Sequence, residues 1–262
     1  MSVEQVSEQD KDYQRYLEFI RSRIYLTDTV LSDQIKYIYE KIYMITTIAS
    51  ALDRLNPRSF IGDFYYECKN NLIVCLDLCN AGYVNASKQI LRSGIESFFR
   101  LSLAVEHFIE YRNNKRISVF RSTPSLQKLK ALQQTHGVRK LTNFVTDFYS
   151  GKSVGVIYKD LNSIYSTLSG NVHVNKRENF TPHRFLIDYV ENNKEKSSKY
   201  INDMENVVNL IIIAFYNFSL QLGDEGVVFS KRDITEFSYT LGSTPILDDI
   251  DSEYEKGIHP TP

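Results

Sequence analysis

Apolar residues recur every three or four positions along most of this chain, which is the period of an α-helix. The same period runs through residues 8–26, 62–80, 83–113, 154–168 and 196–222. It is clearest in residues 32–55, whose apolar stripe consists of Ile35, Ile38, Ile42, Ile45, Ile48 and Leu52. We find no stretch in which apolar and polar residues alternate as they do in a half-buried strand. The pattern therefore predicts an all-α protein.

Residues that end helices fall between these segments. Pro57 ends the segment 32–55, because the residue before a proline avoids the helical conformation. Pro124 is suited to the first turn of a short helix, and Gly137 and Gly151 enclose another. The sequence contains only 11 glycines and 6 prolines, whereas sandwiches and barrels need frequent turn residues. This distribution also favours long helices.

The organisation predicted from these segments is one antiparallel helical bundle. We expect a helical domain over residues 1–222, in which extra N-terminal helices within residues 8–55 pack on a core of about 62–222. Residues 223–262 show a weaker period and end in the acidic sequence DDIDSEYEKGIHPTP. We therefore expect a loose C-terminal extension with a partly disordered acidic tail.

Charge and hydropathy narrow the functional classes. The chain has 31 Lys and Arg against 32 Asp and Glu, so a broadly basic nucleic-acid surface is excluded, although a local basic groove is not. The polar N-terminus does not resemble a signal peptide. The most apolar run, residues 207–222, is short for a membrane span and contains Asn209 and Asn217. We therefore expect a cytoplasmic protein that does not contact a membrane.

The three cysteines, Cys68, Cys75 and Cys79, are spaced by 7 and 4 residues and so share one face of a helix. An odd number of cysteines argues against a disulfide framework. A metal site here would need a further ligand, and no histidine is near. We therefore expect buried structural thiols, with no metal and no other cofactor.

The sequence contains none of the strong catalytic motifs, such as a P-loop, a GxGxxG loop or HExxH. A first polar cluster nevertheless stands out, because Asn85, Lys88, Arg92 and Glu96 share one arc of the helix 83–113, most of which is apolar. Arg92 and Glu96 are four residues apart, so we expect them to form an ion pair with little exposure. Such a pair is costly to bury and is a candidate site. The alternatives are a solvated, salt-bridged face of the helix and a pair that only fixes the packing of the core.

A second polar cluster follows the apolar segment 154–168. Tyr165, Ser169 and His173 recur every four residues, and Lys176 and Arg177 come directly after them. A histidine that titrates near neutrality, beside a hydroxyl and two cations, is suited to phosphodiester chemistry. The alternative is that His173 only interacts with the dipole at the end of its helix.

The segments that carry these clusters are AGYVNASKQILRSGIESFFRL and, some 70 residues later, IYSTLSGNVHVNK. Together they resemble the HEPN superfamily of helical domains, closest to the bacterial branch with an Arg-x3-Glu helix and a later Leu-Ser-x3-His segment. The resemblance implies a bundle of four or five helices and a homodimer. Many HEPN domains are metal-independent ribonucleases of toxin–antitoxin or anti-phage systems, whereas others bind nucleotides or are inactive scaffolds. The expected partners are therefore RNA or a nucleotide, and a cognate antitoxin or defence-system protein.

The resemblance implies an endoribonuclease in which His173 is the acid/base on the ribose 2′-hydroxyl and Arg92 stabilises the charge of the phosphorane. The other candidates are the orienting groups Ser169 and Glu96 and the ligand-binding side chains Lys176, Arg177, Tyr165 and Lys88.

The chain departs from the nuclease members of that family in one respect. Those members carry Arg-x4–6-His, but the three allowed positions before His173 are Ser166, Thr167 and Leu168. Arg100…His107 and Arg177…His183 match that spacing elsewhere, and Pro182 interrupts the second match. Two other hypotheses therefore stay open. One is a non-catalytic HEPN-like module that binds a nucleotide or a partner protein at the same cluster, and the other is a purely structural helical protein.

Overall fold

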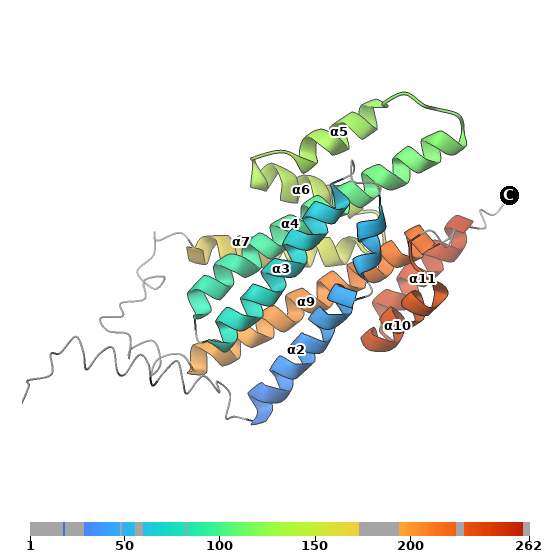
Figure 1. Ribbon diagram of the computed structural model, residues 1–262. Helices are drawn as coiled ribbons and strands as arrows, with labels where there is room; N and C mark the ends of the chain where they lie inside the picture. The colour runs from blue at the N-terminus through green and yellow to red at the C-terminus, as the bar shows by residue number, and fades with distance from the viewer. Residues whose placement is uncertain are drawn as a thin grey trace, which may run out of the picture.

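The computed structural model describes residues 18, 29–47, 49–55, 60–81, 83–172, 194–223 and 228–258. In these ranges every regular element is a helix and there is no strand, so the all-α prediction is confirmed (Figure 1). The elements are α2 (Thr29–Thr47), η1 (Ala49–Arg54), α3 (Ile61–Asn80), α4 (Val84–Arg116), α5 (Pro124–Gln133), α6 (Val138–Tyr149), α7 (Gly155–Val172), α9 (Lys194–Gly223), α10 (Lys231–Leu241) and α11 (Pro245–Ile258).

Two long helices, α4 and α9, form the centre of the molecule. Helix α4 lies beside α3 and also contacts α5, α6, α7 and α9, while α9 contacts α2, α7, α10 and α11 (Figure 1). Phe98 of α4 packs against both α7 and α9. Its ring lies 6.0 Å from that of Tyr158 on α7 and 5.9 Å from that of Phe215 on α9. All three rings are fully buried. One hydrophobic core therefore connects α4, α7 and α9.

The observed helices agree with the apolar period over most of the described chain. The segments 62–80, 83–113, 154–168 and 196–222 correspond to α3, α4, α7 and α9, and Pro124 does begin a short helix. Thr123 caps that helix by accepting a hydrogen bond from the Leu126 N–H at 3.2 Å. The predicted helix 8–26 lies outside the described residues apart from Glu18.

The predicted helix 32–55 is wrong as one continuous element, because it divides into α2 and the 3-10 helix η1. The hydroxyls of Thr46 and Thr47 both donate to the carbonyl of Tyr43 at 2.8 Å. Such side-chain bonds compete with the backbone for the carbonyl that continues a helix. Similar bonds occur inside α4, α6 and α7 without ending those helices, so they weaken α2 locally, and the apolar stripe continues because a 3-10 helix can bury the same face.

The expectation of a loose C-terminal extension is wrong for residues 228–258. Helices α10 and α11 pack against α9 and bury Phe229, Phe237, Leu247 and Ile250. A capping box begins α10, since Ser230 and Asp233 each accept a hydrogen bond from the other's backbone N–H. Burial of a few large apolar side chains against α9 is enough to order two short helices, even where the apolar residues recur only weakly at the helical period.

The apolar composition of α9 is explained by its place in the core. Residues Lys199–Gly223 are long and apolar enough to cross a membrane, but 72% of the most apolar window is buried inside the protein. Helices α2, α4, α7, α10 and α11 all contact α9. Its apolar side chains are therefore covered by the rest of the chain.

The three cysteines are buried, as the spacing predicted, and none forms a disulfide. The Cys75 thiol lies 3.1 Å from both the Ser87 hydroxyl and the Tyr200 hydroxyl, so it belongs to a polar contact between α3, α4 and α9. Burial raises the pKa of Cys75 to about 11 and that of Cys79 to about 12.

We expect these thiols to be unreactive in the native protein. At pH 8 iodoacetamide should alkylate Cys75 at least about 100-fold more slowly than in urea-unfolded protein, because the thiolate is the nucleophile and its population falls as the pKa rises. Mass spectrometry of peptides from samples quenched over time gives the rate at Cys75 in both states. Native alkylation of Cys75 at the unfolded rate would contradict the buried position of this thiol.

Candidate functional site

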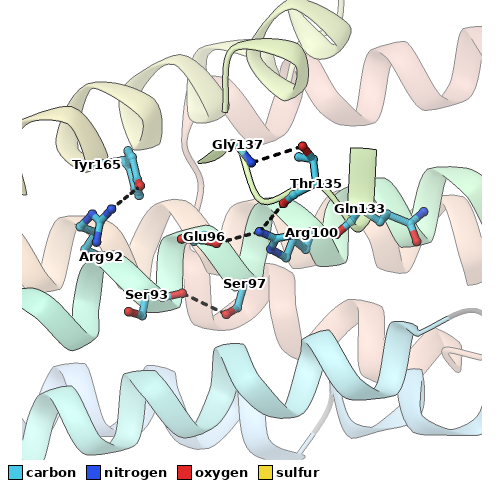
Figure 2. Close-up of polar contacts among 9 residues, drawn as sticks. All are labelled: Arg92, Ser93, Glu96, Ser97, Arg100, Gln133, Thr135, Gly137 and Tyr165. Atoms are coloured by element: carbon cyan, nitrogen blue, oxygen red, sulfur yellow. Dashed lines mark hydrogen bonds and ion pairs between the residues drawn. The ribbon is translucent and has the colours of Figure 1, made fainter. Parts of the chain in front are cut away.

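Arg92 crosses from α4 to α7, where two hydroxyls hold its guanidinium group. Its Nε–H donates to Ser169 Oγ at 2.9 Å, and its Nη2–H donates to the Tyr165 hydroxyl at 2.9 Å. The guanidinium carbon also lies 5.1 Å from the centroid of the Tyr165 ring. Figure 2 shows Arg92 and Tyr165 pointing toward one another from neighbouring helices. We call these three residues the Arg92 cluster.

The local sequence explains why α7 presents two hydroxyls to the same arginine. Tyr165 and Ser169 are four residues apart, so they lie one turn apart on the same face of α7. The ring of Tyr158 anchors that helix against α4, 6.1 Å from the ring of Phe99. Tyr165 is itself buried, whereas Arg92 and Ser169 are half-buried. The cluster therefore lies at the edge of the core, with access to solvent.

The electrostatics of the Arg92 cluster favour an anionic ligand. Both partners of Arg92 are neutral hydroxyls, and no carboxylate of a described residue forms an ion pair with it. The described partners use two of the five N–H donors of the guanidinium group. An arginine whose plane is fixed and whose charge is not neutralised by these partners is suited to bind a phosphate through its other donors.

The expected ion pair between Arg92 and Glu96 is wrong. Glu96 instead pairs with Arg100, whose Nη2 lies 2.8 Å from its Oε1. The reason lies in helix geometry, because a carboxylate four residues before a cation gives a more favourable pair than the reverse order. Glu96 stands before Arg100 in that favourable order, while the side chain of Arg92 is drawn away toward α7. Glu96 is therefore not part of the Arg92 cluster.

Arg100, which was not among the predicted site residues, joins α4 to the connection between α5 and α6. Its guanidinium group donates to the carbonyls of Gln133 at 2.5 Å and Thr135 at 3.0 Å (Figure 2). The Thr135 hydroxyl accepts in turn from the N–H of Gly137, which precedes α6. The polar residues Glu96 and Arg100 thus have a structural role at the end of α5. Their spacing on an otherwise apolar helix was the only sequence signal for it.

Four predicted site residues remain. The structure describes one of them, Lys88, and the other three lie outside the described residues. Lys88 is directed to α9, where its ammonium lies 5.7 Å from the centroid of the Tyr200 ring. It lies one turn before Arg92 on α4 and contributes charge near the cluster. His173, Lys176 and Arg177 lie outside the described residues; His173 directly follows Val172, with which α7 ends.

The described residues were also searched for side chains that could bind a metal ion. Among the described residues, no three His, Cys, Asp or Glu side chains lie close enough together to hold a metal ion. The described groups that converge at the Arg92 cluster are a guanidinium and two hydroxyls, which suit an anion. Comparisons of the chain with protein-family models, with curated proteins and with solved structures found no match.

Proposed function

We propose that this chain is a HEPN-like, metal-independent endoribonuclease of a bacterial toxin–antitoxin or anti-phage system. The observation that carries the proposal is the Arg92 cluster, in which α7 fixes a guanidinium group of α4 through Ser169 and Tyr165. His173 follows Ser169 by four residues in the sequence, which is the spacing of one helical turn. An anion-binding arginine and a titratable imidazole are the two groups that this reaction requires.

In this mechanism Arg92 binds the scissile phosphate and stabilises the negative charge that grows on its oxygens. Ser169 and Tyr165 are positioning residues, because each accepts one N–H of the guanidinium group and so fixes the direction of the others. Preorganisation of this kind lowers the reorganisation that the transition state would otherwise need. Lys88, Lys176 and Arg177 supply further positive charge for neighbouring phosphates.

His173 accepts the proton of the ribose 2′-hydroxyl, and the resulting oxygen attacks the adjacent phosphorus. The bond from phosphorus to the 5′-oxygen of the next nucleotide then breaks, that oxygen takes a proton from water, and the imidazolium of His173 returns its proton to the solvent. The products are a 5′ fragment with a 2′,3′-cyclic phosphate and a 3′ fragment with a free 5′-hydroxyl. We also propose the homodimer and the cognate antitoxin or defence-system partner that the HEPN resemblance implies.

The direct test is incubation of the purified chain with single-stranded RNA, followed by mass spectrometry of the fragment ends. We expect 2′,3′-cyclic phosphate ends and a rate that does not change in EDTA, because the nucleophile is the neighbouring 2′-hydroxyl. Cleavage that leaves a 3′-hydroxyl, or that EDTA abolishes, would contradict the mechanism.

A second candidate is a non-catalytic module that binds RNA or a nucleotide at the same cluster. Two observations favour it: Glu96 is engaged by Arg100, and residues 166–168 contain no arginine. Fluorescence anisotropy with labelled RNA or a labelled nucleotide separates the candidates. Binding that Arg92→Ala abolishes, without any cleavage by the wild-type chain, would favour the module over the ribonuclease.

A further inference from the structure

A cavity of about 570 Å³ lies at the C-terminal end of α4. Its walls come from α4, α9, α11 and the connection between α6 and α7, and its lining residues include Glu106, Arg112, Arg116, Lys152, Asn217 and Gln221. The volume is in the range of small-molecule sites. Ile109 of its wall is 17 residues from Arg92, or roughly 25 Å along the helix. The cavity is therefore separate from the Arg92 cluster.

Two amide side chains on α9 face this cavity without any hydrogen bond to the described residues. Asn217 is 8% exposed, and its Nδ2 is buried without a partner. The Oε1 of Gln221, one helical turn later, is also buried without a partner. An unpaired buried amide costs free energy, so such groups need an explanation. Both side chains line the cavity, and rotation of each terminal amide turns its unpaired atom toward a ligand there.

The connection between α6 and α7 holds a cation at the cavity wall in a fixed position. Lys152 Nζ lies 3.0 Å from Glu106 Oε1 and 4.9 Å from the ring centroids of both Phe148 and Tyr149. Its loop is tight, because the Lys152 N–H donates to the Tyr149 carbonyl at 2.9 Å and the Gly155 N–H donates to the Lys152 carbonyl at 2.8 Å. The ammonium is therefore held at the cavity wall before any ligand binds.

The balance of charge in the lining favours an anionic group. Three cations, Arg112, Arg116 and Lys152, line the cavity with two carboxylates, Glu106 and Glu253. Glu106 lies beside Lys152 and Glu253 accepts the Ser153 N–H at 2.6 Å, so the lining carries an excess of one positive charge. Arg112 and Arg116 are four residues apart on α4, and two guanidinium groups at this spacing are suited to a phosphate.

We propose that this cavity binds a small phosphomonoester whose organic part carries both a hydrogen-bond donor and an acceptor. The phosphate contacts Arg112, Arg116 and Lys152, and the organic part pairs with the amides of Asn217 and Gln221. Ribose 5-phosphate and AMP share this chemistry and differ in the organic part, a sugar in one and a planar base in the other.

Isothermal titration calorimetry with inorganic phosphate, ribose 5-phosphate and AMP tests the site. At least one organic phosphate should bind more tightly than inorganic phosphate, and the tighter of the two shows whether a sugar or a base is preferred. Asn217→Leu and Gln221→Met should each weaken its binding at least tenfold. These variants should keep the helical circular dichroism of the wild type, with a Tm that does not fall, because each removes an unpartnered buried amide.

Asn209→Leu is the matched control, because Asn209 is on the same helix and also has an unpartnered buried amide oxygen, but it does not line the cavity. Its affinity should equal that of the wild type. The absence of saturable binding of all three probes up to about 10 mM, a dissociation constant that corresponds to about −2.7 kcal/mol, would overturn the proposal. So would equal binding by Asn217→Leu and wild type. The readout is binding, so the result does not depend on whether the Arg92 cluster cleaves RNA.

Discussion

Replacement of His173 by alanine is expected to lower the rate of RNA cleavage by about 10²–10⁴-fold, the usual contribution of a positioned general acid or base. The variant loses the group that accepts the proton of the 2′-hydroxyl, while the Arg92 cluster stays in place. Single-turnover cleavage of a labelled RNA measures the rate. Circular dichroism of the same sample shows whether the variant is folded.

Arg92→Ala should reduce cleavage by a comparable factor, because it removes the charge at the phosphate. Arg92→Lys keeps that charge but loses the two fixed hydrogen bonds to Ser169 and Tyr165, so its activity should stay well below that of the wild type. His107 lies on α4, 15 residues beyond Arg92, so His107→Ala is the control and should change the cleavage rate little. A well-folded His173→Ala chain with unchanged activity would move the chemistry away from this cluster.

Arg100→Ala is expected to lower the free energy of unfolding by about 2–4 kcal/mol, because charged hydrogen bonds are worth more than neutral ones. The substitution leaves Glu96 and the carbonyls of Gln133 and Thr135 without their partner. The Arg100 side chain is only 17% exposed, so water replaces these contacts incompletely. Urea denaturation followed by circular dichroism measures the loss.

The matched control for Arg100→Ala is Arg232→Ala. Arg232 also forms an ion pair with a glutamate four residues away, at 2.9 Å, but its side chain is 86% exposed. Arg232→Ala should lower the free energy of unfolding by less than about 0.5 kcal/mol. Cleavage per folded molecule should be unchanged in Arg100→Ala, which would separate its structural role from the proposed role of Arg92. Equal stability of the two variants would show that Arg100 does not hold the end of α5.

Spacing along the chain was enough to find the residues that share a helix face. The four-residue spacing of Tyr165 and Ser169 follows from the period of helix α7, and the seven- and four-residue spacings of the cysteines follow from that of α3. Arg92, Tyr165 and Ser169 could therefore be chosen as candidates before any contact was known. Only the structure shows that the face of α4 with Arg92 meets the face of α7 with Tyr165 and Ser169, because this contact depends on how the two helices pack.

The partners of Glu96 and the surroundings of Asn217 depend on tertiary packing and could not be predicted from spacing along the chain. Two contacts were possible for Glu96 within its own helix, and it pairs with Arg100 because Arg92 is held by α7. Asn217 was visible in the sequence only as a polar residue in an apolar run. Its position in a cavity wall depends on α11 and on the loop of Lys152, which are distant in sequence. Local periodicity determines the face of a helix on which a residue lies, whereas tertiary packing determines what that face meets.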